Sequence, residues 1–226
     1  MKFPQIITNF KVYFEGFGED AVRMAKIHEE VAKKTGVSIG IAVSALDLKE
    51  IVGCVDIPVF VQHIDPIVCG KGTGGLLPEA VKDIGAFGTL LNHSEKRINR
   101  DELAHSIKRA KEVGLKQIVC AESADEGASF LEFEPDMIAV EPPELIGGDI
   151  SVSTANPEII DRSIELVGHG KVIIGAGIKD FRDVKIAFEL GVSGILVSSG
   201  VMKAKDPKAV LLNLAEGIKQ AVSNKY

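Results

Sequence analysis

Cysteine is scarce in this 226-residue sequence, and tryptophan is absent. The three cysteines, Cys54, Cys69 and Cys120, are odd in number, and no two of them stand at CxxC spacing. This pattern argues against both a disulfide framework and a zinc ribbon. Cys120 ends a short apolar run, and we interpret it as a small buried residue.

Long apolar runs are missing as well. None approaches the ~18 residues that a membrane-spanning helix needs. Residues 1–11 also lack the charged segment and long apolar stretch of a signal peptide. We therefore expect a cytoplasmic protein with no membrane attachment.

Basic residues are fewer than acidic ones. Lysine and arginine number 26 against 32 acidic residues, which gives a net charge of −6 and an isoelectric point near 5.5. No block of five basic residues occurs, so a general nucleic-acid surface is not expected. The five histidines do not stand near acids at metal-ligand spacing, and no dinucleotide fingerprint is present. We expect neither a metal nor a cofactor, and we interpret His63, which follows a strand-like run, as structural.

Short apolar runs alternate with helical patterns along the chain. Strands are predicted at 5–9, 38–43, 59–62, 87–91, 117–120, 137–140, 172–175 and 194–197. Helices are predicted at 19–34, 45–52, 78–84, 101–113, 124–131, 157–167, 181–190 and 207–223. Eight such units predict an α/β fold, a (β/α)8 barrel of parallel strands, with a doubly wound open sheet as the alternative. No linker divides the chain, so we expect a single domain over 1–226.

Polar and small residues follow five of the predicted strands, at the end of a barrel where active sites lie. They are Asn9-Phe10-Lys11, Asn92 to Arg97, Glu141, Gly175 to Asp180, and Ser198-Ser199-Gly200. The last two sets stand side by side in a barrel. Their unhindered N–H groups and a nearby helix N-terminus are typical of a phosphate site.

Glu141 follows a buried apolar strand and opens the segment Glu141-Pro142-Pro143-Glu144-Leu145-Ile146-Gly147-Gly148. The prolines stiffen the first half of this loop and the glycines free the second, which favours a lid. The alternative is an ordinary glutamate at a strand end.

Glu141, Lys11 and His93 suit proton abstraction next to a carbonyl. Glu141 would be the base, while Lys11 supplies charge and His93 a hydrogen bond to the oxyanion. Residues 94–97 look like the first turn of a short helix, and a helix N-terminus would keep the His93 imidazole neutral.

Three of these segments resemble the motifs of the triosephosphate isomerase family, in the same order along the chain. They are Asn9-Phe10-Lys11, Asn92-His93-Ser94-Glu95-Lys96-Arg97, and Glu141-Pro142-Pro143-Glu144-Leu145-Ile146-Gly147. The resemblance implies interconversion of D-glyceraldehyde 3-phosphate and dihydroxyacetone phosphate, with Glu141, His93 and Lys11 as the catalytic groups. It gives Asn9 a substrate contact and makes Glu95 a supporting acid that acts through Lys11.

The resemblance also implies a phosphate site and an oligomer. Gly147 from the lid would close on the phosphate, and Gly177 with Ser198, Ser199 and Gly200 would hold the rest of it. Thr73 matches the tip of a loop that reaches a neighbouring subunit. The short length and the absence of tryptophan resemble the compact archaeal branch, which implies a homotetramer, with a dimer as the alternative.

Two other functions stay open on the residues alone. One is another phosphate-binding barrel enzyme, which would share the loops after the last two strands. The other is a barrel that serves only as a scaffold, although Lys11, His93 and Glu141 are all intact.

Overall fold

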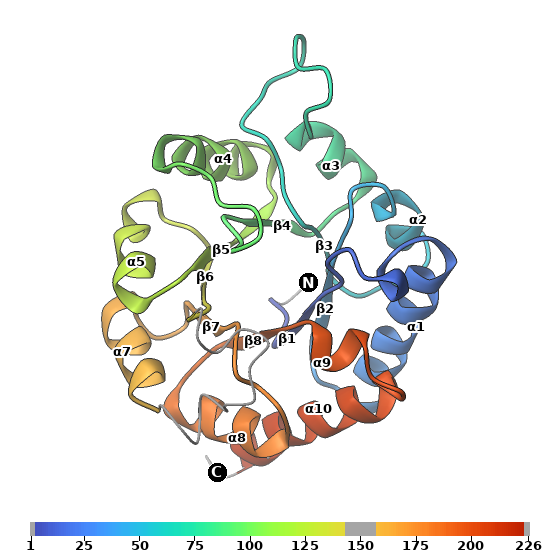
Figure 1. Cartoon of the computed structure of the whole chain (residues 1–226), viewed down its shortest axis with the longest axis vertical. Coiled ribbons are helices and arrows are strands. Elements are labelled where there is room, and N and C mark those ends of the chain that lie inside the picture. The colour runs from blue at the N-terminus through green and yellow to red at the C-terminus, as the bar shows by residue number, and fades with distance from the viewer. Residues whose placement is uncertain (1–2, 143–156, 224–226) are drawn as a thin grey trace.

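Eight parallel strands close into a barrel in the computed structural model, and helices surround it (Figure 1). The structure describes residues 3–142 and 157–223. The strands are β1 (Ile6–Asn9), β2 (Ile39–Val43), β3 (Val59–Val61), β4 (Gly88–Leu91), β5 (Lys116–Ala121), β6 (Met137–Val140), β7 (Val172–Ile174) and β8 (Gly194–Val197). Each strand pairs with the next, and β8 pairs with β1 through Ile195 and Ile6. The predicted fold is therefore confirmed.

The described helices follow the strands in the predicted alternation. The α-helices are α1 (Gly18–Thr35), α2 (Leu48–Val52), α3 (Pro78–Ile84), α4 (Arg100–Val113), α5 (Ala124–Ser129), α7 (Pro157–Val167), α8 (Phe181–Leu190), α9 (Ser199–Met202) and α10 (Pro207–Ser223). Two 3-10 turns, η1 (Phe14–Gly16) and η2 (Leu131–Phe133), complete them. No helix in this part of the chain is long and apolar enough to cross a membrane.

Two predicted helices are longer than those observed. The helix expected from 45 begins at Leu48, because residues 45–47 form a turn in which the Ser44 carbonyl accepts the Asp47 N–H at 3.2 Å. The helix expected to reach 131 ends at Ser129. The next residue, Phe130, is buried in the core, with 5% of its surface exposed. The 3-10 turn η1 and the short helix α9 were not predicted.

The core has two parts because side chains alternate across each strand. One set fills the barrel interior: Ile7, Ala42, Phe60, Leu90, Ile118, Cys120, Met137, Ala139, Ile173 and Leu196. A larger set packs between the strands and the helices. At the amino end, the rings of Phe3, Phe60 and Phe87 lie 5.3–5.9 Å apart between centroids.

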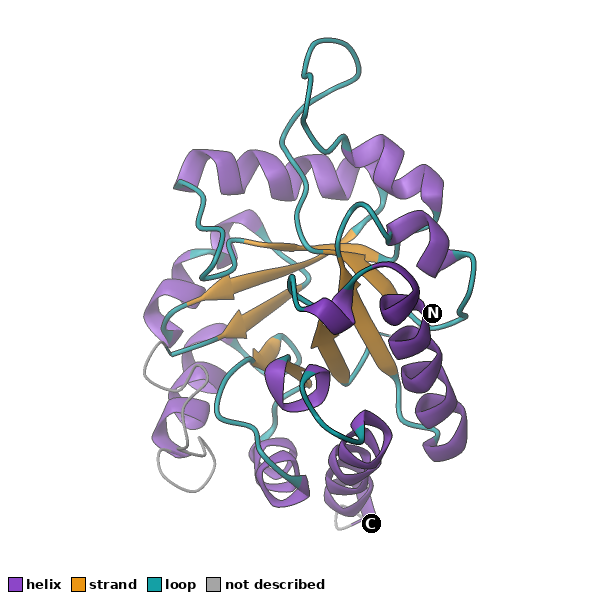
Figure 2. Ribbon diagram, turned by 45° about the vertical axis from the view of Figure 1, so that its right-hand side comes forward, coloured by secondary structure: helices purple, strands orange, loops and turns teal. Residues whose placement is uncertain are grey.

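The loop between β3 and α3 protrudes from the body of the molecule (Figures 1 and 2). Residues 69–75 of this loop are exposed. Gly70, Gly72 and Gly74 have positive φ angles of 135°, 153° and 87°, which residues with side chains rarely adopt. The shape of this loop therefore depends on glycine.

Candidate active site

The polar residues that follow the strands meet in one cavity at the carboxyl end of the barrel. Its volume is about 350 Å³. Residues after β1, β4, β6, β7 and β8 line it. Parallel strands bring these ends together although the residues lie far apart in the sequence.

Lys11 is fixed in this cavity by its neighbours. Its backbone has a φ of 49°, and its N–H donates to the Asn9 Oδ1 at 3.0 Å. The Gln62 amide donates to the Lys11 carbonyl at 2.9 Å and to the Asn9 Oδ1 at 3.2 Å. The Lys11 Nζ lies 2.8 Å from the Glu95 Oε1. A positive φ at a residue with a side chain stores strain, and such strain occurs most often at functional sites.

His93 is positioned by the residue before it. Asn92 also has a positive φ, of 58°. Its side chain donates to the Cys120 carbonyl at 3.0 Å and accepts the Ile98 N–H at 3.2 Å. These bonds hold the chain where it leaves β4, and the imidazole that follows faces the cavity.

The His93 ring is neutral, with its proton on Nε2. The backbone N–H of Glu95 donates to Nδ1 at 3.1 Å, so Nδ1 accepts and Nε2 carries the hydrogen. Burial, and then the charge of Lys11, lower the pKa of the imidazole below its usual value. Nε2 lies 3.8 Å from the Glu141 Oε2.

The helix start that we expected to keep this ring neutral does not lie next to His93. Residues 94–97 form a turn and not the start of a helix, with the Lys96 N–H donating to the His93 carbonyl at 2.7 Å. The helix begins later, at Arg100, where the Asn99 side chain caps it. Burial and the charge of Lys11 therefore lower the pKa of His93 in place of a helix dipole, and the Glu95 N–H decides which ring nitrogen carries the proton.

Glu141 is a buried carboxyl group, 6% exposed, directly after β6. Burial raises its pKa to about 7, although a hydrogen bond with the Cys120 thiol and the charge of Lys11 act in the opposite direction. Its Oε2 has no hydrogen-bond partner in the described part of the chain. A carboxylate oxygen without such a bond is costly to bury, but it is free to accept a proton.

Gly175 makes room for Glu141. A Cβ at this position would lie 2.7 Å from the Glu141 Oε1 and closer still to its Cγ. The Gly175 N–H donates to the Val140 carbonyl at 2.9 Å, which holds the two strand ends together. A side chain here would therefore move either the carboxylate or β7.

The loops after β7 and β8 form the other side of the cavity. Gly177 has a φ of 73°, and Ser199 and Gly200 begin α9. The Ser198 hydroxyl donates to the Asn9 carbonyl at 2.7 Å, so it ties the end of β8 to the end of β1.

The structure places most of the predicted site residues together. The cavity is lined by Asn9, Lys11, His93, Glu141, Gly177, Ser198, Ser199 and Gly200. Glu95 contacts the site through Lys11. Thr73 lies at the exposed tip of the protruding loop, and Gly147 lies outside the described residues.

Three contributors to the site were missed. Gln62 ends the third predicted strand, a position that could have been included with the other strand ends. Cys120 is buried as expected, but its thiol contacts Glu141, and burial raises the pKa of that thiol. Gly175 was noted only as part of a glycine-rich loop, because its contact with Glu141 depends on how β6 and β7 lie together.

The fold and the cavity define an enzyme of the (β/α)8-barrel class, with a carboxyl group, a neutral imidazole and an ammonium group around one site. The family model described as triosephosphate isomerase matches residues 4–217. The chain belongs to this family.

Three archaeal triosephosphate isomerases illustrate the relationship. The protein of Methanocaldococcus jannaschii is 44% identical, over 94% of this chain and 99% of its own length. That of Methanobacterium bryantii is 43% identical, over 95% and 97%. That of Saccharolobus solfataricus is 42% identical, over 99% and 100%. The resemblance to the compact archaeal form therefore extends over nearly the whole chain.

Proposed function

We propose that this chain interconverts D-glyceraldehyde 3-phosphate and dihydroxyacetone phosphate, as a step of glycolysis and gluconeogenesis. One observation carries the proposal beyond family membership. A carboxyl group with its pKa raised to about 7 shares a cavity with a neutral imidazole and a lysine. A base whose pKa lies near the working pH is well matched to moving a proton from carbon.

Glu141 removes the proton from the carbon next to the carbonyl. His93 donates a hydrogen bond from Nε2 to the oxygen that gains negative charge, and the Lys11 ammonium stabilises the same charge. A proton also moves from the hydroxyl oxygen to the former carbonyl oxygen, with His93 as the carrier between the two oxygens. Glu141 then returns its proton to the neighbouring carbon, so the aldehyde and ketone exchange places. No atoms are gained or lost.

The phosphate binds at the loops after β7 and β8. The first N–H groups of a helix have no partner within it, so the start of α9 at Ser199 and Gly200 offers donors to an anion. Gly177 supplies another from the opposite loop. The Ser198 hydroxyl already donates to Asn9, so this residue holds the site together and contributes through its backbone.

A coupled assay tests the proposal. The purified chain receives D-glyceraldehyde 3-phosphate, and dihydroxyacetone phosphate is measured by its enzymatic reduction. Glu141→Gln should lower turnover by about 10²–10⁴-fold, because it removes the general base. Glu122→Gln, the same change at an exposed carboxylate after β5, is the matched control and should retain activity.

Deuterium exchange tests the chemistry separately. In D2O the wild-type product should carry deuterium at the carbon next to the carbonyl, since Glu141 exchanges its proton with solvent. Full turnover in folded Glu141→Gln would remove Glu141 as the base, whereas product without deuterium would mean that the transferred proton does not exchange with solvent during turnover.

We also infer a homo-oligomer, with a tetramer favoured over a dimer by the resemblance to compact archaeal relatives. Exposed apolar side chains follow β1 and β2: Val12, Phe14, Phe17 and Leu46. The two loops that carry them are joined by a bond from the Gly18 N–H to the Asp47 Oδ1 at 2.8 Å. We propose that this patch packs against a second copy of the chain. The part of that copy that contacts it would be the protruding loop, which has Thr73 at its tip.

Light scattering on the purified protein tests the assembly. A particle of four 24.1-kDa chains is expected, and a particle of two would favour the dimer. Phe14→Glu should reduce the particle size, because it places a charge in the patch. Val222→Glu, at an exposed apolar residue on α10, is the control.

The location and the domain organisation follow from the same proposal. We infer a cytoplasmic enzyme, since triose phosphates are intermediates of pathways that run there. One barrel accounts for the described residues, and we infer a single domain over 1–226.

A further inference from the structure

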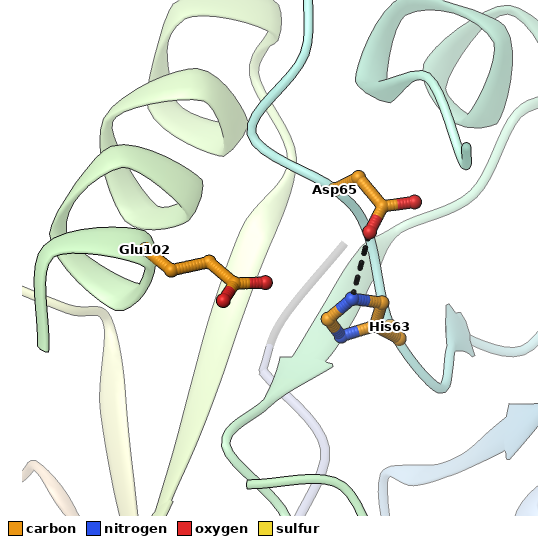
Figure 3. Close-up of side chains that lie close together, drawn as sticks. All are labelled: His63, Asp65 and Glu102. Carbon is orange, nitrogen blue, oxygen red and sulfur yellow. Dashed lines mark hydrogen bonds and ion pairs between the residues drawn. The ribbon is translucent and has the colours of Figure 1, made fainter. Parts of the chain in front are cut away.

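A second cluster of polar groups lies outside the cavity. His63 follows β3, Asp65 starts the protruding loop, and Glu102 lies in the first turn of α4. One ligand atom from each residue lies within 4.8 Å of those from the other two. Figure 3 shows Glu102 extending from its helix toward the His63–Asp65 pair. None of the three residues lines the cavity at the end of the barrel.

The imidazole of this cluster is suited to bind a metal ion. His63 is 6% exposed, and burial, followed by the charge of Lys96, lowers its pKa below the usual value. Asp65 and Glu102 act in the opposite direction. A neutral ring keeps a lone pair on one nitrogen, and neutral histidine is the form that ligates metals.

Asp65 is already oriented for the same purpose. Its Oδ2 accepts the Leu76 N–H at 2.6 Å, while its Oδ1 lies 3.3 Å from the His63 Nε2. A hydrogen bond to one carboxylate oxygen fixes the other, and metal-ligating carboxylates commonly have such a partner.

One carboxylate is enough to pair with a histidine, and Glu102 brings a second one to the cluster. Both carboxylates and the charge of Lys96 act on the His63 ring. The sequence suggested no histidine near acids at ligand spacing, and this was wrong. Asp65 stands two residues from His63, and the fold brings Glu102 from another helix.

We propose that His63, Asp65 and Glu102 bind one divalent transition-metal ion of the Zn²⁺ type. One imidazole nitrogen and two carboxylate oxygens form a known donor set for such ions, with water completing the coordination. The side chains must close by roughly 1 Å, since ligands at about 2 Å from zinc lie nearer to one another than 4.8 Å. The ion would join the base of the protruding loop to α4.

Calorimetric titration of the chelator-treated, full-length protein with ZnCl2 tests the proposal. One ion per chain should bind. Glu102→Gln should weaken binding at least tenfold, because it removes a charged ligand while keeping the shape of the side chain. Asp101→Asn removes the same charge one residue away, at an exposed position, and should bind like the wild type.

Cobalt distinguishes this cluster from the exposed Cys69. Co²⁺ added to the wild type should give a visible d–d band without the near-ultraviolet band of a thiolate ligand, and Cys69→Ser should give the same spectrum. Equal Zn²⁺ affinity in Glu102→Gln and Asp101→Asn would overturn the proposal. So would a thiolate band, or no binding by the wild type at millimolar Zn²⁺.

Discussion

The amino and carboxyl ends of the barrel are filled by different kinds of residue. The amino end is closed by the contacting rings of Phe3, Phe60 and Phe87. The carboxyl end holds a buried Glu141 oxygen that has no hydrogen-bond partner among the residues the structure describes. It also holds two side-chain-bearing residues with positive φ, Lys11 and Asn92. These costly features lie where the chemistry is, while the amino end is filled mainly by packing, although Glu134 with a φ of 54° and the buried Gln117 Oε1 also lie toward that end. Stability and activity should therefore respond to different substitutions.

Phe60→Ala should have the largest effect on stability. Phe60 is fully buried in the barrel interior, so the substitution should cost about 3–5 kcal/mol of unfolding free energy. Turnover of the folded protein should stay near that of the wild type, since the cavity lies at the other end. Denaturant titration at fixed protein concentration and the coupled assay measure the two effects. Phe60→Leu, which leaves a smaller void, should lose less stability. A large fall in turnover of the folded variants would show that stability and activity do not depend on separate ends of the barrel.

The second prediction concerns how Glu141 changes stability with pH. Its pKa is about 7 in the folded chain and 4.5 in the reference state, so between these values the folded chain holds a proton that the unfolded chain has lost. Stability of the wild type should therefore fall as pH rises through this window, by on the order of 3 kcal/mol. Glu141→Gln should lack this loss.

Denaturant midpoints of wild type and Glu141→Gln at both ends of the window measure the difference. Glu122→Gln, at an exposed carboxylate, is the control. If the gap between wild type and Glu141→Gln did not widen with rising pH, the buried carboxyl group would not carry the cost assigned to it.

Gly175→Ala should reduce activity through geometry alone. The added methyl group would meet the Glu141 side chain, and displacement of a catalytic group by about 1 Å can cost about 10²-fold in rate. The assay should show a lower kcat, although the substitution changes neither the length nor the net charge of the chain. Gly53→Ala, where a Cβ meets only ordinary contacts at 3.5 Å, should be active. Wild-type kcat in Gly175→Ala would mean that the carboxylate has room to move.

Glu95→Gln should have the smallest effect on stability. The Lys11–Glu95 pair is 2.8 Å long, but the Glu95 side chain is 57% exposed, so solvent screens the attraction. Such pairs contribute about 0.2–1 kcal/mol. Denaturant titration at low and high salt should show a small difference that shrinks with salt. A loss as large as that of Phe60→Ala would show that the two ends are less distinct than they look.

The sequence predicted the barrel because each strand is a short apolar run that is recognisable locally. The cavity followed from the same reasoning, since parallel strands place all their carboxyl ends together. Lys11, His93 and Glu141 were singled out because each lies one or two residues after such a run. The helix boundaries at 45 and 131 were wrong, because a turn at Ser44 and the burial of Phe130 depend on contacts that periodicity does not contain.

Contacts between neighbouring strands were harder to predict. Cys120 and Gly175 lie on the two sides of Glu141, on β5 and after β7, and neither has a sequence neighbour that suggests this. Glu102 lies far along the chain from His63 and meets it only in the folded structure. Residues whose role is set by one partner across the fold give no local signal.

The bond from the Glu95 N–H to the His93 Nδ1 also bears on how this site tolerates mutation. The donor belongs to the main chain, so replacing the side chain at residue 95 does not remove it. Among the common amino acids, proline alone lacks this N–H. Any substitution at residue 95 except proline therefore leaves the donor that keeps the imidazole proton on Nε2.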